Sequence, residues 1–195
     1  MPADHQPNLL HVDWSKIPRP KDDGGAVHLT GANMPDVVLP ATDGAKVNVG
    51  ALTGRWVIFF YPRTNRPDEP SLVDDWDQIP GARGCTPQTC AYRDLRDDLR
   101  SAGATGVFAV STQRSNYQAE LVTRLQLPFS ILSDADLRLT EAMQLPTLTV
   151  AGQTLIKRMS MVVDDGRIVA VNYPVFPPDQ DAPNVLAWLR ANPGG

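Results

Sequence analysis

The stretch RWVIFFYP, residues 55–62, decides the fold class, because its centre is an unbroken apolar run that ends at a proline. The apolar residues of the run are Val57, Ile58, Phe59, Phe60 and Tyr61. A run of this length, without alternating polar residues, is typical of a strand that is buried on both faces. We therefore expect it to be the central strand of a sheet that has other elements packed on each side.

Strands and helices alternate on the carboxyl side of this run. VFAVS at 107–111 and FSILSD at 129–134 predict two more buried strands. Between and after them, AYRDLRDDLRSAG, SNYQAELVTRLQ and ADLRLTEAMQL are helical in composition. The first helix ends at Gly103, a suitable C-cap, the second opens with Ser115 as its N-cap, and Pro146 stops the third.

Two hairpins flank this alternation. The first surrounds the turn Asp43-Gly44 within residues 34–49, and the second joins predicted strands at 156–164 and 167–174. DAPNVLAWLRANP then closes the chain as a helix. Strands that alternate with helices, followed by a hairpin and a last helix, indicate an α/β fold, a three-layer sandwich around a mixed central sheet.

The length of 195 residues fits one domain with room for a substantial core. We expect an extended N-terminal arm at residues 1–30, rich in Pro, Asp and Gly, and a domain at residues 31–195. A loop-like, acidic stretch around Trp76 interrupts the domain at about residues 64–83. The apolar residues of the arm that could dock on the domain are Leu9, Leu10, Val12, Trp14 and Ile17.

Composition and charge exclude several classes of partner. The formal net charge is −4 with no long run of basic residues, which argues against a nucleic-acid surface. No apolar stretch reaches the roughly 18 residues that span a bilayer, and the N-terminus lacks the features of a secretory signal. We therefore expect no membrane partner and a cytoplasmic location, where a disulfide is more often transient and catalytic than structural.

The same counts argue against a metal centre. A structural zinc site needs four Cys or His ligands in closely spaced pairs. This chain has two cysteines, and its three histidines, His5, His11 and His28, all lie near the N-terminus. We expect no metal ligands.

Both cysteines, Cys85 and Cys90, lie at what the sequence predicts to be the start of a helix. Thr86 and Pro87 suggest an N-cap and a first-turn proline directly after Cys85. At that end of a helix, free backbone N–H groups and the helix dipole stabilise a thiolate, and Arg83 could add to the effect. Cys85 is thus a candidate nucleophile; the alternative is a thiol without a chemical role.

The spacing of the two cysteines restricts how they could react. Five residues along a helix give about 7.5 Å of rise and a rotation of roughly 140°, so the Cα atoms lie beyond the ~7 Å limit for a disulfide. If a bond forms between Cys85 and Cys90, the first turn must unwind. That order suits a cysteine that is first oxidised to a sulfenic acid and then resolved as an intramolecular disulfide.

Several segments together resemble a peroxiredoxin of the Q type, the bacterioferritin-comigratory branch. They are the TDG turn and FFYP, then GCTPQTCAYRDL, STQ, LPFSILSD and KRMSMVVDDGRIV, and the resemblance runs from about Pro35 to Leu189. It implies a thioredoxin-like fold that reduces hydrogen peroxide and organic hydroperoxides without a metal or organic cofactor. As partners we expect a thioredoxin- or glutaredoxin-like protein as reductant, and we expect a monomer or weak homodimer, although the residues themselves specify neither the reductant nor the oligomeric state.

The resemblance assigns three site residues. Cys85 matches the peroxidatic cysteine, Cys90 the resolving cysteine, and Arg158 the active-site arginine. The guanidinium of Arg158 would stabilise the thiolate and align the peroxide oxygens by paired hydrogen bonds. Without the resemblance, Arg158 reads as a solvated residue at the start of a strand.

One feature departs from the family pattern Pro-x-x-x-Thr-x-x-Cys. This chain has Ala82 three residues before Cys85, and Pro62 lies 23 residues before it rather than seven, which implies an insertion of 16 residues. Thr64 could fold back to supply the hydroxyl, or the backbone N–H groups of Gly84 and Cys85 could serve alone. The sequence leaves this choice open.

Two other functions use the same cysteines. One is a thiol–disulfide reductase on the same fold, although the spacing of Cys85 and Cys90 and the position of Pro87 count against it. The other is a redox sensor, in which the disulfide controls a partner protein through the acidic loop. A peroxidase should consume peroxide far faster than free cysteine does, whereas a reductase should reduce insulin-like disulfides.

Overall fold

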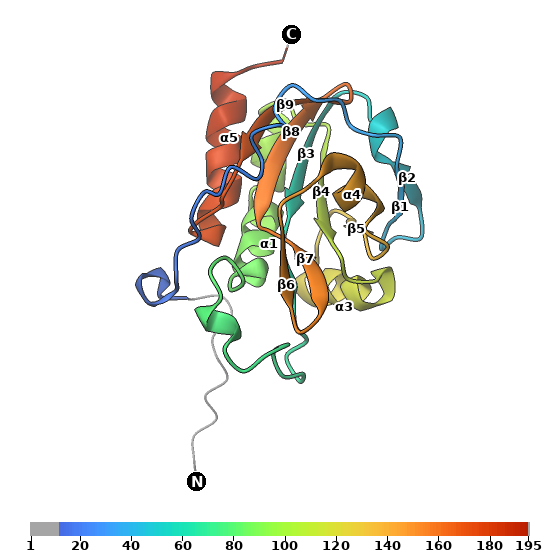
Figure 1. Cartoon of the computed structure of the whole chain (residues 1–195). Helices are drawn as coiled ribbons and strands as arrows, with labels where there is room; N and C mark the ends of the chain where they lie inside the picture. Colours follow the sequence, from blue (N-terminus) through green and yellow to red (C-terminus); the bar gives the residue numbers. More distant parts are fainter. Residues whose placement is uncertain (1–11, 195) are drawn as a thin grey trace.

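A mixed five-stranded sheet forms the centre of this computed structural model, which describes residues 12–194 (Figure 1). Its strands lie in the order β5-β4-β3-β8-β9. Their bounds are Arg55–Phe60 (β3), Gly106–Ser111 (β4), Ile131–Ser133 (β5), Met159–Asp164 (β8) and Arg167–Asn172 (β9). β3 pairs in parallel with β4 and antiparallel with β8, so the apolar run forms the central strand, as predicted.

Helices cover one face of this sheet. They are α1 (Cys85–Asp94), α2 (Arg96–Ser101), α3 (Ser115–Leu125) and α5 (Asp181–Ala191). The opposite face packs against α4 (Arg138–Met143), residues 26–41 and the hairpin of β1 (Val38–Pro40) and β2 (Lys46–Asn48). The predicted three-layer sandwich is confirmed.

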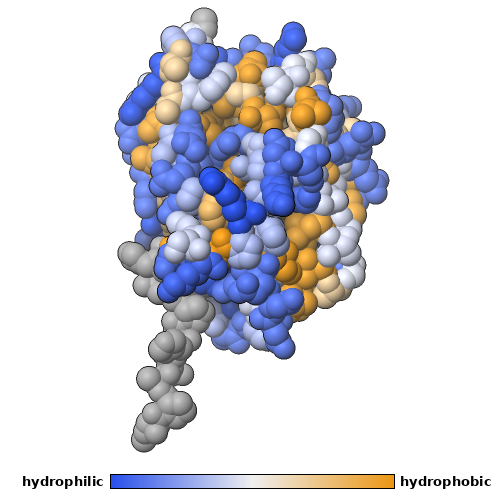
Figure 2. Space-filling view, turned by 60° about the vertical axis from the view of Figure 1, so that its left-hand side comes forward, coloured by the Kyte–Doolittle hydropathy of each residue, from blue (hydrophilic) through white to orange (hydrophobic). Residues whose placement is uncertain are grey.

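The alternation of side chains along β3 explains why both faces are covered. Val57, Phe59 and Tyr61 alternate with Ile58 and Phe60 along the strand. The first three side chains enter the core under the helices, and the other two enter the core on the opposite face. All five are fully buried, and each large apolar side chain stabilises the fold by about 1.5–3 kcal/mol. Figure 2 shows a mostly hydrophilic surface on which hydrophobic side chains appear in separate patches.

Several element boundaries differ from those predicted. The helix after the cysteines divides at Leu95 into α1 and α2, and Arg114 rather than Ser115 occupies the N-cap position of α3. The predicted strand at 156–164 is interrupted, because β7 (Gln153–Ile156) ends before Lys157 and β8 begins at Met159.

A third hairpin, of β6 (Thr147–Val150) and β7, was not predicted. Its turn residues Ala151 and Gly152 both have positive φ angles, of 48° and 74°. Alanine seldom adopts this conformation, so the sequence carried none of the usual hairpin signals. The hairpin anchors the stretch at residues 64–83, which is irregular as predicted except for the 3-10 helix η3 (Trp76–Gln78). Trp76 and Ala82 pack there against Val150 and Leu155.

The N-terminal segment reaches the start of α1. The short helix η1 (Trp14–Lys16) lies beside η4 (Pro178–Gln180), where the Trp14 indole donates a 3.0 Å hydrogen bond to Asp179. The Trp14 ring also meets Phe176 edge to face. Trp14 therefore docks on the domain as predicted, whereas Leu9 and Leu10 lie outside the described residues. The remaining 3-10 helix is η2 (Val49–Ala51).

Candidate active site

Helix α1 begins at Cys85, and its N-cap is Gly84 rather than the predicted Thr86. Gly84 has φ of 109°, and its carbonyl accepts a 3.1 Å hydrogen bond from the backbone N–H of Gln88. Thr86 and Pro87 lie inside the first turn, and no side chain caps it. Cys85 is therefore the first helical residue, at the end where backbone N–H groups are free.

Close packing leaves no room for a side chain at Gly84. A Cβ atom there would lie 2.5 Å from Cγ of Pro178 and 2.8 Å from Cη2 of Trp14. The N-terminal segment and η4 thus press directly against the residue that precedes Cys85. Glycine is required both for this approach and for the positive φ.

Arg158 lies beside Cys85 although the two residues are far apart in sequence. Because Phe60 pairs with Met159, the residues just beyond them, Tyr61 and Arg158, lie at the same end of the sheet. From there Nη2 of Arg158 reaches Sγ of Cys85 at 3.3 Å. Arg158 is only 2% exposed, so its alternative reading as a solvated strand residue is wrong.

The guanidinium of Arg158 is held by further acceptors. The two hydrogens of its Nη2 are shared among the Cys85 sulfur and the carbonyl oxygens of Gly81, Ala82 and Arg83, each of which lies 3.1 Å from Nη2. Its Nη1 donates a 2.6 Å hydrogen bond to Oε1 of Gln88 on α1. These contacts tie the turn before α1 and the first turn of α1 to one planar group.

Gln88 in turn contacts a buried carboxylate. Its Nε2 donates a 2.8 Å hydrogen bond to Oδ2 of Asp181, the first residue of α5. Burial raises the pKa of Asp181, and four hydrogen bonds to its oxygens oppose that rise. Sequence reasoning missed Gln88 and Asp181, because a glutamine next to a cysteine and an aspartate at a helix start carry no distinctive signal.

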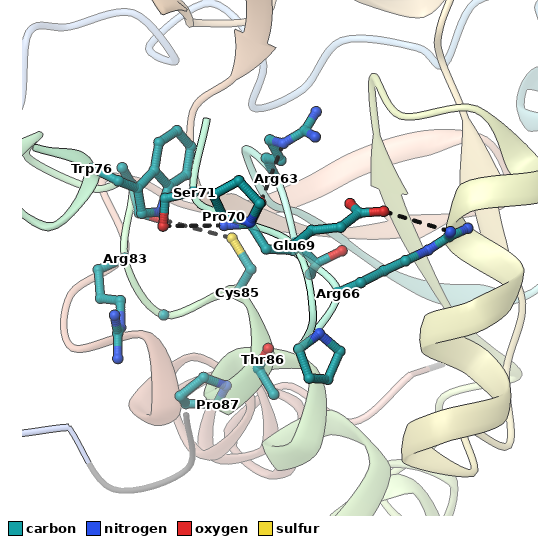
Figure 3. Close-up of a pocket in the computed structure, with 15 residues that line it drawn as sticks. Arg63, Arg66, Glu69, Pro70, Ser71, Trp76, Arg83, Cys85, Thr86 and Pro87 are labelled. Carbon is teal, nitrogen blue, oxygen red and sulfur yellow. Dashed lines mark hydrogen bonds and ion pairs between the residues drawn. The ribbon is translucent and has the colours of Figure 1, made fainter. Parts of the chain in front are cut away.

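Arg83 does not face the thiol. Its Nη1 pairs with both carboxylate oxygens of Asp77 at 2.9 Å, and in Figure 3 its side chain points away from Cys85. The predicted extra positive charge beside Cys85 is therefore balanced by an acid of the inserted stretch. Arg158 supplies the positive charge that contacts the sulfur.

Cys90 is also buried, and both cysteines are free thiols. Burial raises the pKa of the Cys90 thiol, so Cys90 stays protonated more readily than an ordinary cysteine. Only Cys85 lines the cavity at the start of α1. The two thiols therefore differ in environment within the intact helix.

The cavity beside Cys85 has a volume of about 310 Å³ and is shown in Figure 3. Much of its wall comes from residues 63–71 and from Trp76, which belong to the inserted stretch or adjoin it. Apolar Pro67, Pro70 and Pro87 alternate with the polar side chains of the wall. Such a mixed cavity is large enough for a small molecule next to the sulfur.

Thr64 lies in the wall of this cavity and is 3% exposed. Gln113, just after β4, fixes it by accepting from the Thr64 backbone N–H at 2.9 Å and donating to its carbonyl at 2.9 Å. The Thr64 hydroxyl also lies 3.2 Å from Oε1 of Gln113. Ala82 offers only a methyl group, whereas Thr64, whose hydroxyl donates to Gln113, is a threonine that the fold brings into the wall of the cavity of Cys85.

Within residues 12–194, no three or more His, Cys, Asp or Glu side chains are grouped as they would be around a metal ion. Over the same range, no helix has both the length and the apolar character required to cross a membrane.

Comparisons with known proteins show which family the chain resembles. The Redoxin family model matches residues 29–189. Peroxiredoxin Bcp of Escherichia coli is 30% identical over 161 residues, which cover 80% of this chain and 92% of that protein. The chloroplastic peroxiredoxin Q of Oryza sativa subsp. japonica is 28% identical over 163 residues, 83% of this chain and 66% of that protein.

A solved structure extends the comparison to three dimensions. Peroxidoxin BcpB of Mycobacterium tuberculosis has a TM-score of 0.68 at 26% identity, covering 85% of this chain and 98% of that one. The resemblance read from the sequence is thereby confirmed. The chain belongs to the Redoxin family as a peroxiredoxin of the Bcp and Q type, a peroxidase enzyme with a thioredoxin-like fold.

Proposed function

We propose that this protein reduces hydrogen peroxide and organic hydroperoxides through a thiolate at Cys85. The observation that carries the proposal is the 3.3 Å contact between Arg158 and the Cys85 sulfur at the wall of a cavity. The guanidinium stabilises the negative sulfur and presents N–H groups to the oxygens of the peroxide. Thr64 stands on the cavity wall as a hydroxyl partner for the same substrate.

The first chemical step oxidises the sulfur. The Cys85 thiolate attacks the terminal peroxide oxygen, an S–O bond forms and the O–O bond breaks. The products are the Cys85 sulfenic acid and an alkoxide or hydroxide, which takes a proton from water to become an alcohol or water. The sulfur loses the two electrons that the peroxide gains.

The second step is resolution by Cys90. The Cys90 sulfur attacks the sulfenic acid, the S–S bond forms, and water leaves with the proton of the thiol. Because both cysteines lie on α1, the first turn must unwind before they meet. An external dithiol protein of the thioredoxin or glutaredoxin type then reduces the disulfide and is itself oxidised.

We also propose a location, an oligomeric state and domain bounds for this protein. A cytoplasmic location suits a transient disulfide that a dithiol protein reduces. A monomer or weak homodimer, without a metal or organic cofactor, suffices for the first two steps, because the protein groups that they use all come from one chain. The domain proposed at residues 31–195 would carry the activity, and the end of the arm proposed at residues 1–30 contributes Ala26 and Leu29 to the core of that domain.

The test is peroxide consumption by the purified protein with a thioredoxin system as reductant. The wild type should consume peroxide far faster than free cysteine, and Cys85→Ser should be inactive because an alcohol offers almost no anion at neutral pH. Reduction of insulin disulfides, measured in parallel, separates a reductase from a peroxidase. Turnover of peroxide by Cys85→Ser would overturn the proposal.

A further inference from the structure

We infer that Gln88 and Asp181 are positioning residues, which hold the Arg158 guanidinium against the Cys85 sulfur. The inference rests on the proposed function, because it assigns these residues to the same thiol. Arg158, Gln88 and Asp181 form a continuous chain of hydrogen bonds of 2.6 and 2.8 Å. Arg158 is 2% exposed, and Gln88 and Asp181 are fully buried.

The chemistry of the three groups allows one orientation of the Gln88 amide. A guanidinium only donates hydrogen bonds, so the Gln88 oxygen must face Arg158 and its NH₂ group must face Asp181. Oδ2 of Asp181 accepts from that NH₂ group at 2.8 Å. Without this acceptor the amide could turn over and present its NH₂ group to the guanidinium, where two donors would oppose each other.

Asp181 is itself fixed by elements on three sides. Its Oδ1 accepts from Ser160 on β8 and Asn172 on β9, at 2.6 and 2.8 Å. Its Oδ2 also accepts from the Tyr92 hydroxyl on α1 at 2.9 Å. The carboxylate therefore connects the sheet, α5 and α1, and its fixed position in turn fixes the NH₂ group of Gln88.

The position of Gln88 connects its hydrogen bonds to Arg158 and Asp181 with the redox cycle. Gln88 lies between Cys85 and Cys90, within the segment that must unwind before the two sulfurs can meet. Unwinding removes Gln88 from both Arg158 and Asp181. The arginine is thus held in place while the thiolate waits for peroxide, and is released from Gln88 when the disulfide forms.

The decisive variant is Gln88→Leu, which keeps the side-chain volume and removes both hydrogen bonds. We expect the rate at which Cys85 is alkylated at neutral pH, followed by mass spectrometry, to fall by about tenfold, the equivalent of one charge-assisted contact.

The matched control is Thr140→Val, on the opposite face of the sheet. It removes a 2.6 Å hydrogen bond from the Thr140 hydroxyl to Asp134, another buried carboxylate that does not contact Arg158 or Gln88. Thr140→Val should lower the melting temperature without changing the reactivity of Cys85.

A paired substitution tests the direction of the hydrogen bonds. Gln88→Glu alone should reduce reactivity, because it sets a second buried carboxylate against Asp181. In the double variant Gln88→Glu with Asp181→Asn, the amide introduced at position 181 donates to the carboxylate introduced at position 88, which still accepts from Arg158. Reactivity should then recover to near the wild-type value, with the NH₂ group at position 181 also donating to the Tyr92 hydroxyl oxygen, because Gln88 and Tyr92 contact the same oxygen of Asp181 in the wild type.

The outcomes separate this inference from the proposed function. Loss of Cys85 reactivity in Gln88→Leu supports the inference even if the wild type consumes no peroxide, because alkylation needs no peroxide. If Gln88→Leu only lowers the melting temperature, as Thr140→Val does, the network is merely structural and the inference is wrong. Failure of the double variant to recover reactivity would also overturn it.

Discussion

Arg158 lies 3.3 Å from the sulfur of Cys85 although 73 residues separate them in the chain. The antiparallel pairing of β3 with β8 brings them together, because Arg158 immediately precedes the residue that pairs with Phe60. The same guanidinium spans the turn before α1 and the first turn of α1. Charge at the thiol and the local structure of the helix start are therefore coupled through one residue.

Arg158→Met should slow peroxide attack while the fold remains intact. Loss of a charge-assisted contact of about 1.5–3 kcal/mol corresponds to roughly ten- to a hundredfold in rate. Arg158→Lys is the matched control. Its rate constant should lie between those of the wild type and Arg158→Met, since an ammonium keeps the charge but not the planar fork. The measurement is the second-order rate constant with peroxide. An unchanged constant in Arg158→Met would mean that Arg158 has no role in the reaction with peroxide.

Cys90→Ser should complete one turnover and then stop. Without a resolving thiol, the sulfenic acid on Cys85 persists and becomes open to trapping or overoxidation. Mass spectrometry after one equivalent of peroxide and dimedone should show the adduct on Cys85. The resolving role of Cys90 fails if this variant continues to cycle with the thioredoxin system at the wild-type rate.

Formation of the disulfide should unwind the start of α1. Residues 86–91 should exchange their amide hydrogens faster in the oxidised protein, because the bond cannot form across an intact helix. The central run from Val57 to Tyr61 should stay protected in both forms, which provides the internal reference. Equal protection of residues 86–91, with the disulfide confirmed by mass, would contradict local unfolding.

Gly84→Ala should destabilise the protein more than Gly103→Ala. Both glycines have similar positive φ angles, 109° and 103°, so both substitutions carry a backbone cost of about 1–2 kcal/mol. Only Gly84 is crowded, by Pro178 and Trp14, whereas nothing lies within 4 Å of a Cβ at Gly103. Overlap should add about 1–3 kcal/mol, measured as the free energy of unfolding in urea. Equal losses would mean that neither Pro178 nor Trp14 packs against Gly84 in solution.

Acid should weaken the attachment of the segment that contains Asp23. Hydrogen bonds from Lys157 and Tyr173 hold the pKa of Asp23 well below its ordinary value of 3.8. A carboxylate with a lowered pKa stabilises the fold above its ordinary pKa, and this stabilisation is lost as the pH falls through the folded value. The difference in melting temperature between wild type and Asp23→Asn should therefore shrink as the pH falls below about 4. A difference that stays constant would contradict this linkage.

Much of the fold could be read from the sequence, because its signals are local. The unbroken run ending at Tyr61 predicts a strand buried on both faces, and β3 is the central strand. The Asp43-Gly44 and Asp165-Gly166 turns marked two hairpins that the structure contains. The helix start at Cys85 was also predicted, although its cap was assigned to Thr86 instead of Gly84.

The contacts of the site were decided only by the tertiary structure. Gln88 and Asp181 lie 93 residues apart, and nothing in either neighbourhood indicates that they share a hydrogen bond. The third hairpin escaped prediction because Ala151 takes a positive φ that its residue type disfavours. Strands, helices and turns can be predicted from the backbone preferences of neighbouring residues and from the spacing of their apolar side chains. A site depends on which strand ends meet in the sheet, so its partners are determined only when the whole chain has folded.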